Sequence, residues 1–237
     1  MIDEEFGRRL RTAFNAPAEL PVHQLFNEWW SHAPAAVTQS YVDVLMSDER
    51  FRSLLGESQF SPPLDLVVLG ALPVGSLGRC YRDWIVDNGL AAAIAADYRR
   101  FHDSLERSGR LEGMPVELRF AILRGFQVHD FMHVLTGYDS SSSGELALQA
   151  FSLAQFPFPY FGMWMSVVTT RMTFHEPRMI EATMDSITDG WHYGRQAENL
   201  MVQPWEDLLS EPVEALRQRF TVEPSPVAAR KIARAAG

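Results

Sequence analysis

The sequence predicts an all-α fold, a multi-helix bundle that forms a single domain over residues 1–222. Apolar residues recur at spacings of three or four over long segments, which is the period of an amphipathic helix. Proline followed two residues later by an acid opens three segments, at Pro115, Pro204 and Pro212, and this pairing favours a helix start. Alternating runs of the kind that a half-buried strand needs are nearly absent. Helices are therefore the elements that we expect.

Four segments can be assigned in order along the chain. Residues 66–69 form the one strand-like run, but it is short and we interpret it as helix or coil. Residues 90–107 are alanine-rich and amphipathic, and Gly109 is placed to end that helix. Residues 115–136 and 177–201 have the same helical periodicity.

The stretch between Glu145 and Arg171 holds no charged residue and is long enough to cross a bilayer. Pro157 and Pro159 interrupt it, and two shorter helices inside a protein satisfy their backbone more easily than one broken span in lipid. We therefore expect two buried helices here. Residues 223–237 are expected to form a flexible C-terminal tail.

Composition and charge exclude several classes of function. The 237 residues are 46% hydrophobic and 22% charged, as in ordinary globular proteins. A net charge of −9 opposes binding to a polyphosphate backbone, so we expect no nucleic-acid partner. The N-terminus has early acids and no apolar run behind a basic start, so we expect no secretion. The lone cysteine, Cys80, excludes an internal disulfide and fits a reducing, cytoplasmic location.

One cluster of residues indicates metal chemistry. His129, Asp130 and His133 share one narrow face of a helix, because a helix turns by about 100° per residue. Gly137 and a serine run then break the helix, so that Glu145 can fold back against that face. Two imidazoles with one or two carboxylates suit a divalent transition metal, and fewer than four protein ligands leave a position for water or substrate.

Three alternatives remain open at this point. The histidines can be buried helix residues that bond to their neighbours, although four ionisable groups on an apolar helix are costly to bury without a cation. A zinc-peptidase helix has the same histidine spacing, but Asp130 is one methylene shorter than the glutamate of such enzymes. A nucleotide phosphohydrolase built on a His-Asp dipeptide needs a further histidine and aspartate, for which only His102 and Asp185 are available, without a supporting spacing.

The motif His129-Asp130-x-x-His133, followed after eleven residues by Gly144-Glu145, resembles the hallmark of the coenzyme Q (ubiquinone) biosynthesis protein 4 family. Upstream, the segment 75–81 is similar to the family's Gly-x-Leu-Gly-x-x-Tyr pattern, and segments 194–197 and 205–217 resemble its C-terminal helices. The loop 138–143 departs from the family's usual proline and threonine pattern, which puts the choice of substrate in doubt.

The resemblance implies an all-α, often dimeric protein that holds a prenylated aromatic precursor and replaces its ring carboxylate by a hydroxyl. It makes His129, Asp130, His133 and Glu145 the metal ligands, with Asp130 and Glu145 also the candidate catalytic groups. The implied cofactor is one divalent ion, zinc first, with iron, manganese or magnesium as alternatives. The runner-up is a non-catalytic prenyl-lipid carrier or scaffold of a quinone biosynthesis complex, in which the metal only joins two helices.

A prenyl tail needs a long apolar cavity, and the charge-free stretch supplies candidates for its lining. We expect substrate contacts from four of its residues, Phe156, Phe158, Met163 and Trp164. Arg79 and Tyr81 are candidate anchors for an acidic head group, because arginine binds a carboxylate through two hydrogen bonds. The expected partners are a prenylated quinone precursor or another polyprenyl lipid, a second copy of the chain, and other quinone biosynthesis enzymes. The expected location is cytoplasmic, with peripheral contact to the inner face of the membrane.

Overall fold

The computed structural model describes residues 3–16, 25, 28–56, 64–91, 107, 109 and 111–224. Over these residues the fold is all-α, as predicted, and contains no β-strand. The elements are α1 (Glu4–Asn15), α3 (Trp29–His32), α4 (Ala35–Ser47), α5 (Glu49–Gly56), α6 (Leu66–Gly70), α7 (Leu77–Asp87), α10 (Val116–Thr136), α11 (Ser142–Gln155), α12 (Pro159–His175), α13 (Ile180–Gln196) and α14 (Val213–Arg219). Three 3-10 turns accompany them, η1 (Pro177–Met179), η2 (Leu200–Val202) and η3 (Trp205–Asp207).

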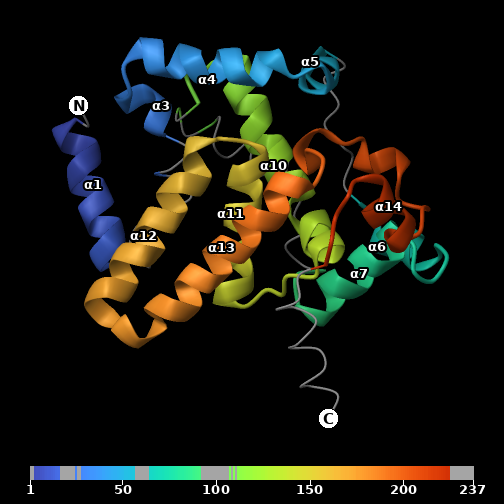
Figure 1. Ribbon diagram of the computed structural model, residues 1–237. Helices are drawn as coiled ribbons and strands as arrows, with labels where there is room; N and C mark the ends of the chain where they lie inside the picture. The colour runs from blue at the N-terminus through green and yellow to red at the C-terminus, as the bar shows by residue number, and fades with distance from the viewer. Residues whose placement is uncertain are drawn as a thin grey trace.

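Helix α10 runs through the middle of the molecule and contacts α4, α7, α11 and α14 (Figure 1). Helices α12 and α13 form an antiparallel pair on one side, and α6, α7 and α14 lie on the other side. Fourteen residues of α10 are buried, around most of its circumference, which explains why so long a helix shows little amphipathic contrast. The helix is therefore a central element of the hydrophobic core.

The contact between α11 and α13 is unusually close because two glycines remove side chains from it. A Cβ at Gly190 would lie 2.0 Å from the carbonyl oxygen of Ala147. One helical turn later, a Cβ at Gly194 would lie 2.5 Å from the carbonyl oxygen of Phe151. The backbones of the two helices thus touch along this line, which fixes the position of α11.

The structure corrects some expected helix boundaries. Pro115 and Pro212 were expected to be the first residues of their helices. They are instead the N-cap residues, so α10 and α14 each begin one residue later than predicted. Pro204 leads only into the short η3 turn, so the predicted helix there is wrong. The predicted helix 177–201 is divided into η1, α13 and η2. The backbone becomes extended at Ala197, which ends α13 before η2 begins.

The other assignments fare differently. The strand-like run 66–69 lies within the helix α6, whose first N–H groups are capped by the carboxylate of Asp65. The expected helix 90–107 falls almost entirely outside the described residues, as does the expected tail beyond residue 224. Gly109, placed to end that helix, has a φ of 73°.

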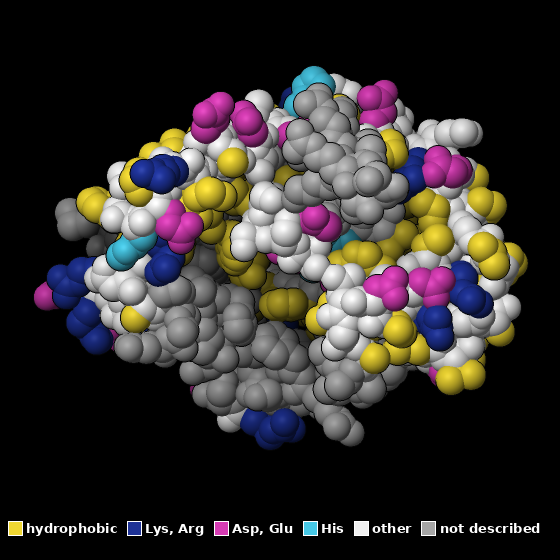
Figure 2. Space-filling view, turned by 90° about the horizontal axis from the view of Figure 1, so that it is seen from below, with side chains coloured by type: hydrophobic (Ala, Val, Ile, Leu, Met, Phe, Trp, Pro, Cys, Tyr) yellow, Lys and Arg dark blue, Asp and Glu magenta, His cyan; other side chains and the backbone are white. Residues whose placement is uncertain are grey.

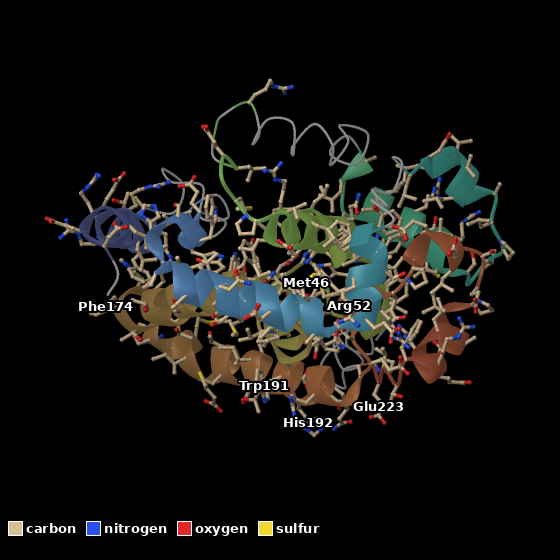
Figure 3. All side chains as sticks on the ribbon, turned by 90° about the horizontal axis from the view of Figure 1, so that it is seen from above. Met46, Arg52, Phe174, Trp191, His192 and Glu223 are labelled. Atoms are coloured by element: carbon tan, nitrogen blue, oxygen red, sulfur yellow. The ribbon has the colours of Figure 1, made fainter. Side chains whose placement is uncertain are left out.

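The charge-free stretch folds as two helices, as predicted, but only α11 is largely buried, because in α12 the buried residues are Phe161 and Val167 alone. Helix α11 ends at Gln155 and α12 begins at Pro159, with extended residues between them. In the described part of the chain, no helix has both the length and the apolar character that a membrane crossing requires. Phe174, near the end of α12, and His192, on α13, lie at the edge of the molecule (Figure 3), and the phenyl ring of Phe174 is among the most exposed apolar groups.

Candidate metal centre and adjacent cavity

The turn between α10 and α11 returns the chain tightly on itself. Gly137 ends α10 in a left-handed conformation, with a φ of 75°. The side-chain oxygen of Ser141 accepts from the N–H of Gly144 at 3.2 Å and so caps the start of α11. A Cβ at position 144 would lie 2.1 Å from the carbonyl oxygen of Asp139, so only glycine fits there. Glu145, in the first turn of α11, is thereby placed against the last turns of α10.

Three side chains from these two consecutive helices converge on one point. The Nε2 atoms of His129 and His133 lie 3.3 Å apart. The carboxylate oxygens of Glu145 lie 3.3 Å from Nε2 of His129 and 3.2 Å from Nε2 of His133. Ligand atoms around a tetrahedral zinc ion lie about 3.4 Å apart when each bond is about 2.1 Å long. The spacing of the three groups therefore matches that of ligands around one small cation.

The hydrogen bond of His133 supports the same interpretation. Its Nδ1–H donates to the carbonyl oxygen of Tyr138 at 2.9 Å, so in the neutral ring Nε2 carries a lone pair. This lone pair faces a carboxylate oxygen of Glu145, which is also an acceptor. Two acceptors at this distance repel unless a proton or a cation lies between them. The donor set thus fits a divalent metal ion.

Asp130 belongs to the same cluster at longer range. It is buried, and one ligand atom from each of His129, Asp130 and His133 lies within 4.8 Å of the other two. Its negative charge acts on the imidazole of His129. The structure therefore places Asp130 near the two histidines and Glu145 in contact with them, and the role of all four as ligands stays a prediction.

The ionisable groups of the centre perturb one another strongly. Burial tends to raise the pKa of Glu145, but hydrogen bonds and charge from His129 and His133, in their protonated form and without a metal ion, lower it to about 2. Burial opposes the charging of His129, yet the hydrogen bond and charge of Glu145, with the charge of Asp130, raise its pKa above the ordinary value. Burial, together with the charge of Glu145, raises the pKa of Tyr160 to about 12. Glu145 is therefore anionic, and Tyr160 a neutral phenol, at neutral pH.

The sequence alone did not reveal the groups that hold His133. The indole of Trp84, from α7, stacks on its imidazole with ring centroids 4.8 Å apart and an interplanar angle of 17°. Tyr138, whose carbonyl accepts from His133, donates its hydroxyl to the carboxylate of Asp189 on α13 at 2.8 Å. The imidazole is therefore held by Trp84 and by the carbonyl of Tyr138, and a hydrogen bond from the second ring nitrogen to such an acceptor is usual for metal-binding histidines.

A cavity of about 190 Å³ opens directly beside the centre. His129 and Glu145 lie in its wall, and most of the remaining lining is aromatic or aliphatic. Among the predicted substrate contacts, Phe156, Phe158 and Trp164 line this cavity. Viewed from below, the described surface carries its charged groups mainly around the periphery, with hydrophobic side chains in the central hollow (Figure 2).

The other three predicted substrate contacts do not line this cavity. Met163 is partly buried against the hydrophobic core. Arg79 donates to Asp83 at 3.2 Å and to the carbonyl of Gly70, within the α6–α7 region. Tyr81 is fully buried and packs on Phe131, with centroids 4.5 Å apart. From α7 it is Trp84, rather than Arg79 or Tyr81, that reaches the centre.

The model of the family described as coenzyme Q (ubiquinone) biosynthesis protein Coq4 matches residues 33–226, which is most of the chain. This chain belongs to the Coq4 family. The match includes α10, α11 and the cavity-lining start of α12, so the family resemblance drawn from the motif is confirmed.

Curated Coq4 proteins agree with this assignment. The chain is 30% identical to ubiquinone biosynthesis protein COQ4, mitochondrial, from Yarrowia lipolytica, over 77% of this chain and 65% of that protein. It is 28% identical to the Sclerotinia sclerotiorum protein of the same description, over 81% of this chain and 64% of that one. The aligned region thus spans slightly less than two thirds of these relatives. Both are described as mitochondrial, and they give no support to the expected cytoplasmic location.

A solved structure has the same fold. A Nostoc punctiforme protein, provisionally named a ubiquinone biosynthesis protein, superposes with a TM-score of 0.69 at 24% identity. The superposition covers 93% of this chain and 98% of the other. At this identity the likeness concerns the fold alone, and it extends over nearly the whole chain.

Proposed function

We propose that this Coq4-family protein is a metal-dependent enzyme of ubiquinone biosynthesis. Its substrate would be a prenylated hydroxybenzoate-type ring, whose carboxylate it replaces by a hydroxyl. The observation that carries the proposal is the set of His129, His133 and Glu145 at mutual distances of 3.2 to 3.3 Å, in the wall of an apolar cavity. Polar groups that converge at the edge of an apolar pocket favour a ligand with a polar head and an apolar body.

The partial exposure of the centre favours catalysis over a purely structural metal. The side chains of His129 and Glu145 are 30% and 29% exposed, whereas that of His133 is fully buried. Structural zinc sites are closed by four protein ligands, while catalytic sites keep a position for water or substrate. A centre open on the cavity side therefore supports the enzyme over the carrier or scaffold.

Each side chain has a task in the proposed reaction. His133, fixed by Tyr138 and Trp84, keeps Nε2 directed at the centre, and Glu145, whose pKa is lowered, balances positive charge there. The charge of Asp130 favours the charged form of His129. A bound divalent ion would supply a Lewis acid for the carboxylate and phenol oxygens of the substrate.

The walls of the cavity hold the ring and exclude water. Typical ligand pockets measure about 300–1,000 Å³. The cavity of about 190 Å³ is smaller, so it suits the ring and the first part of a prenyl chain rather than a whole polyprenyl lipid. The rest of a longer chain would leave the cavity.

The overall chemistry requires an oxidant. The bond between the ring and its carboxylate carbon breaks, and that carbon leaves as carbon dioxide. The new hydroxyl takes one oxygen atom from dioxygen, and the other atom leaves as water after uptake of two electrons and two protons from an external reductant. We further propose that the protein works as a homodimer, peripheral to a membrane, with other quinone biosynthesis enzymes.

Metal content provides the first test. Purified protein should carry about one divalent ion per chain, measured by elemental mass spectrometry. Glu145→Ala and His133→Ala should remove most of it, because each deletes one of the three converging donors. Glu198→Ala, which deletes a surface carboxylate paired with Arg50, is the matched control and should keep the ion. Metal content that is unchanged in Glu145→Ala would remove this residue from the site.

Turnover separates the enzyme from the carrier. Metal-loaded protein is given the carboxylated prenyl precursor, a reductant and air, and the products are analysed by mass spectrometry. The enzyme should form the ring-hydroxylated product and release carbon dioxide, and Glu145→Ala should abolish both. A carrier would bind the precursor and return it intact.

A further inference from the structure

A line of polar side chains runs along the cavity-facing side of α11. Glu145, Gln149 and Ser152 stand at spacings of four and three residues, so they share one face of the helix, and all three line the cavity. Four helical residues rise about 6 Å, so Gln149 lies roughly one aromatic ring beyond Glu145 along the helix axis. The wall therefore offers a second polar contact to a ring whose acidic end lies at the metal centre.

The carboxamide of Gln149 has a hydrogen-bonding capacity that the protein leaves unused. Its side chain is buried, with a relative exposure of 6%, and its Oε1 atom has no hydrogen-bond partner. Buried side-chain oxygens in folded proteins nearly always accept a hydrogen bond, because water is no longer available to them. The unpaired oxygen has almost no accessible surface in the wall of the cavity, so a rotation of the side-chain amide brings it to a donor that arrives with a ligand.

The nearest hydroxyl along the helix is already directed elsewhere. Ser152, the next member of the line, donates to the sulfur of Met132 at 3.7 Å. Tyr160, on α12, also lines the cavity and stays a protonated phenol, because burial and the charge of Glu145 raise its pKa. Gln149 is the member of the line whose acceptor oxygen is buried without a partner.

We infer that Gln149 recognises a hydroxyl on the aromatic ring of the bound ligand, whose O–H donates to Oε1 of Gln149. The ligand class is thus a phenol with a free O–H, and the corresponding aryl methyl ether is discriminated against. This inference rests on the proposed function in one respect, that the cavity holds a ring-bearing ligand. It adds a specificity-determining contact outside the four candidate metal ligands.

The chain contains a matched control for this residue. Gln127, on α10, is also buried and also has an Oε1 atom without a hydrogen-bond partner, but it does not line the cavity. Gln149→Met and Gln127→Met therefore make the same chemical change inside and outside the binding site. Both remove an unpaired buried oxygen and preserve side-chain length, so both variants should fold with an unchanged or higher melting temperature.

The test uses the full chain and two probes, a dimethylallyl-substituted phenol and its methyl ether, with dissociation constants from calorimetry. The native protein and Gln127→Met should bind the phenol about tenfold more tightly than the ether, the factor that one hydrogen bond provides. Gln149→Met should bind both probes equally. The inference is overturned if the native protein shows no preference, if Gln149→Met keeps it, if Gln127→Met loses it, or if neither probe binds.

Two arrangements keep the test decisive. If Gln149→Met does not fold, Gln149→Leu replaces it, and the two-probe comparison on the native protein still decides whether a free O–H is recognised. Metal content and turnover are measured on the same samples. A preference for the phenol without turnover contradicts the proposed reaction and leaves the recognition standing, whereas turnover without the preference overturns the recognition alone.

Discussion

Helix α11 meets α13 and α12 in opposite ways. Towards α13 the contact is made by backbone, because Gly190 and Gly194 bring the two helices together without intervening side chains. Towards α12 aromatic side chains fill part of the space, and the cavity of about 190 Å³ lies there, lined by residues of α10, α11 and α12. One helix thus has a closed face and an open face.

The difference explains how a site can be both fixed and accessible. The closed face holds α11 in place, and with it Glu145, whose two short contacts to the histidines tolerate little displacement. The open face can leave room for a ligand because rigidity is supplied from the other side. Substitutions that fill the two faces should therefore have opposite consequences.

The largest effect is expected from filling the closed face. The new Cβ of Gly190→Ala would lie 2.0 Å from the carbonyl oxygen of Ala147, which forces the helices apart. We expect a loss of about 3 kcal/mol, the upper end of the usual cost of overpacking. This should lower the melting temperature by roughly 6 to 12 °C in a chain of this size. Metal content should fall as well, because α11 carries Glu145.

Gly162→Ala provides the control for this variant. Gly162 lies within α12, and a Cβ there would have no atom within 4 Å. The same substitution should therefore raise stability by up to about 1 kcal/mol, since alanine favours a helix. A similar melting temperature for the two variants would show that the α11–α13 contact is not as tight as the distances indicate.

A smaller effect on stability, of opposite sign, is expected from a substitution in the wall of the cavity. Gly125, in α10, lines the cavity, and a Cβ there would make an ordinary contact of 3.5 Å with Met201. Gly125→Ala should raise stability by roughly 0.5–1 kcal/mol through helix propensity. It should also weaken binding of the prenylated phenol, because the methyl group takes space from the cavity. Thermal denaturation measures the stability, and calorimetry measures the affinity for the prenylated phenol. An unchanged affinity would place the ligand elsewhere.

Local and short-range signals explain what the sequence could predict. The histidine spacing and the helix-ending Gly137 are patterns that span only one or two helical turns. They predicted that the two histidines lie together, as the structure shows. The two helices of the charge-free stretch follow from the local effect of Pro157. These features need no knowledge of which helices pack together.

The rest depends on packing between distant segments. Trp84 reaches His133 only because α7 packs on α10, and Asp189 meets Tyr138 only because α13 closes on α11. The expected anchor Arg79 is instead held by Asp83 and by the carbonyl of Gly70. The neighbouring pair Gly190 and Gly194 carried a detectable signal, since small residues four apart permit close approach of helices, and it was not used.

The smallest effect concerns α1. This helix packs against α12, which lies on the open face of α11. Asp3 caps α1, accepting from the N–H of Phe6 at 2.8 Å, and it also pairs with His32. The hydrogen bond from Phe6, which has the largest effect, and the contact with His32 lower the pKa of the Asp3 carboxyl below its ordinary value of 3.8. The stability that its charge contributes is therefore present above about pH 4 and is lost as the pH falls through the lowered pKa.

Asp3→Asn keeps the capping oxygen and removes the charge, so it isolates this contribution. Its melting temperature at pH 7 should be lower than that of the native protein by an amount on the order of 1 °C, because the carboxylate is exposed and screened. The difference should disappear as the pH falls through the lowered pKa of Asp3, where the native carboxyl also becomes protonated. Metal content at pH 7 should not change, since α1 contacts α12 and not the backbone-packed side of α11. A loss of metal would show that the open face, too, helps to fix the centre.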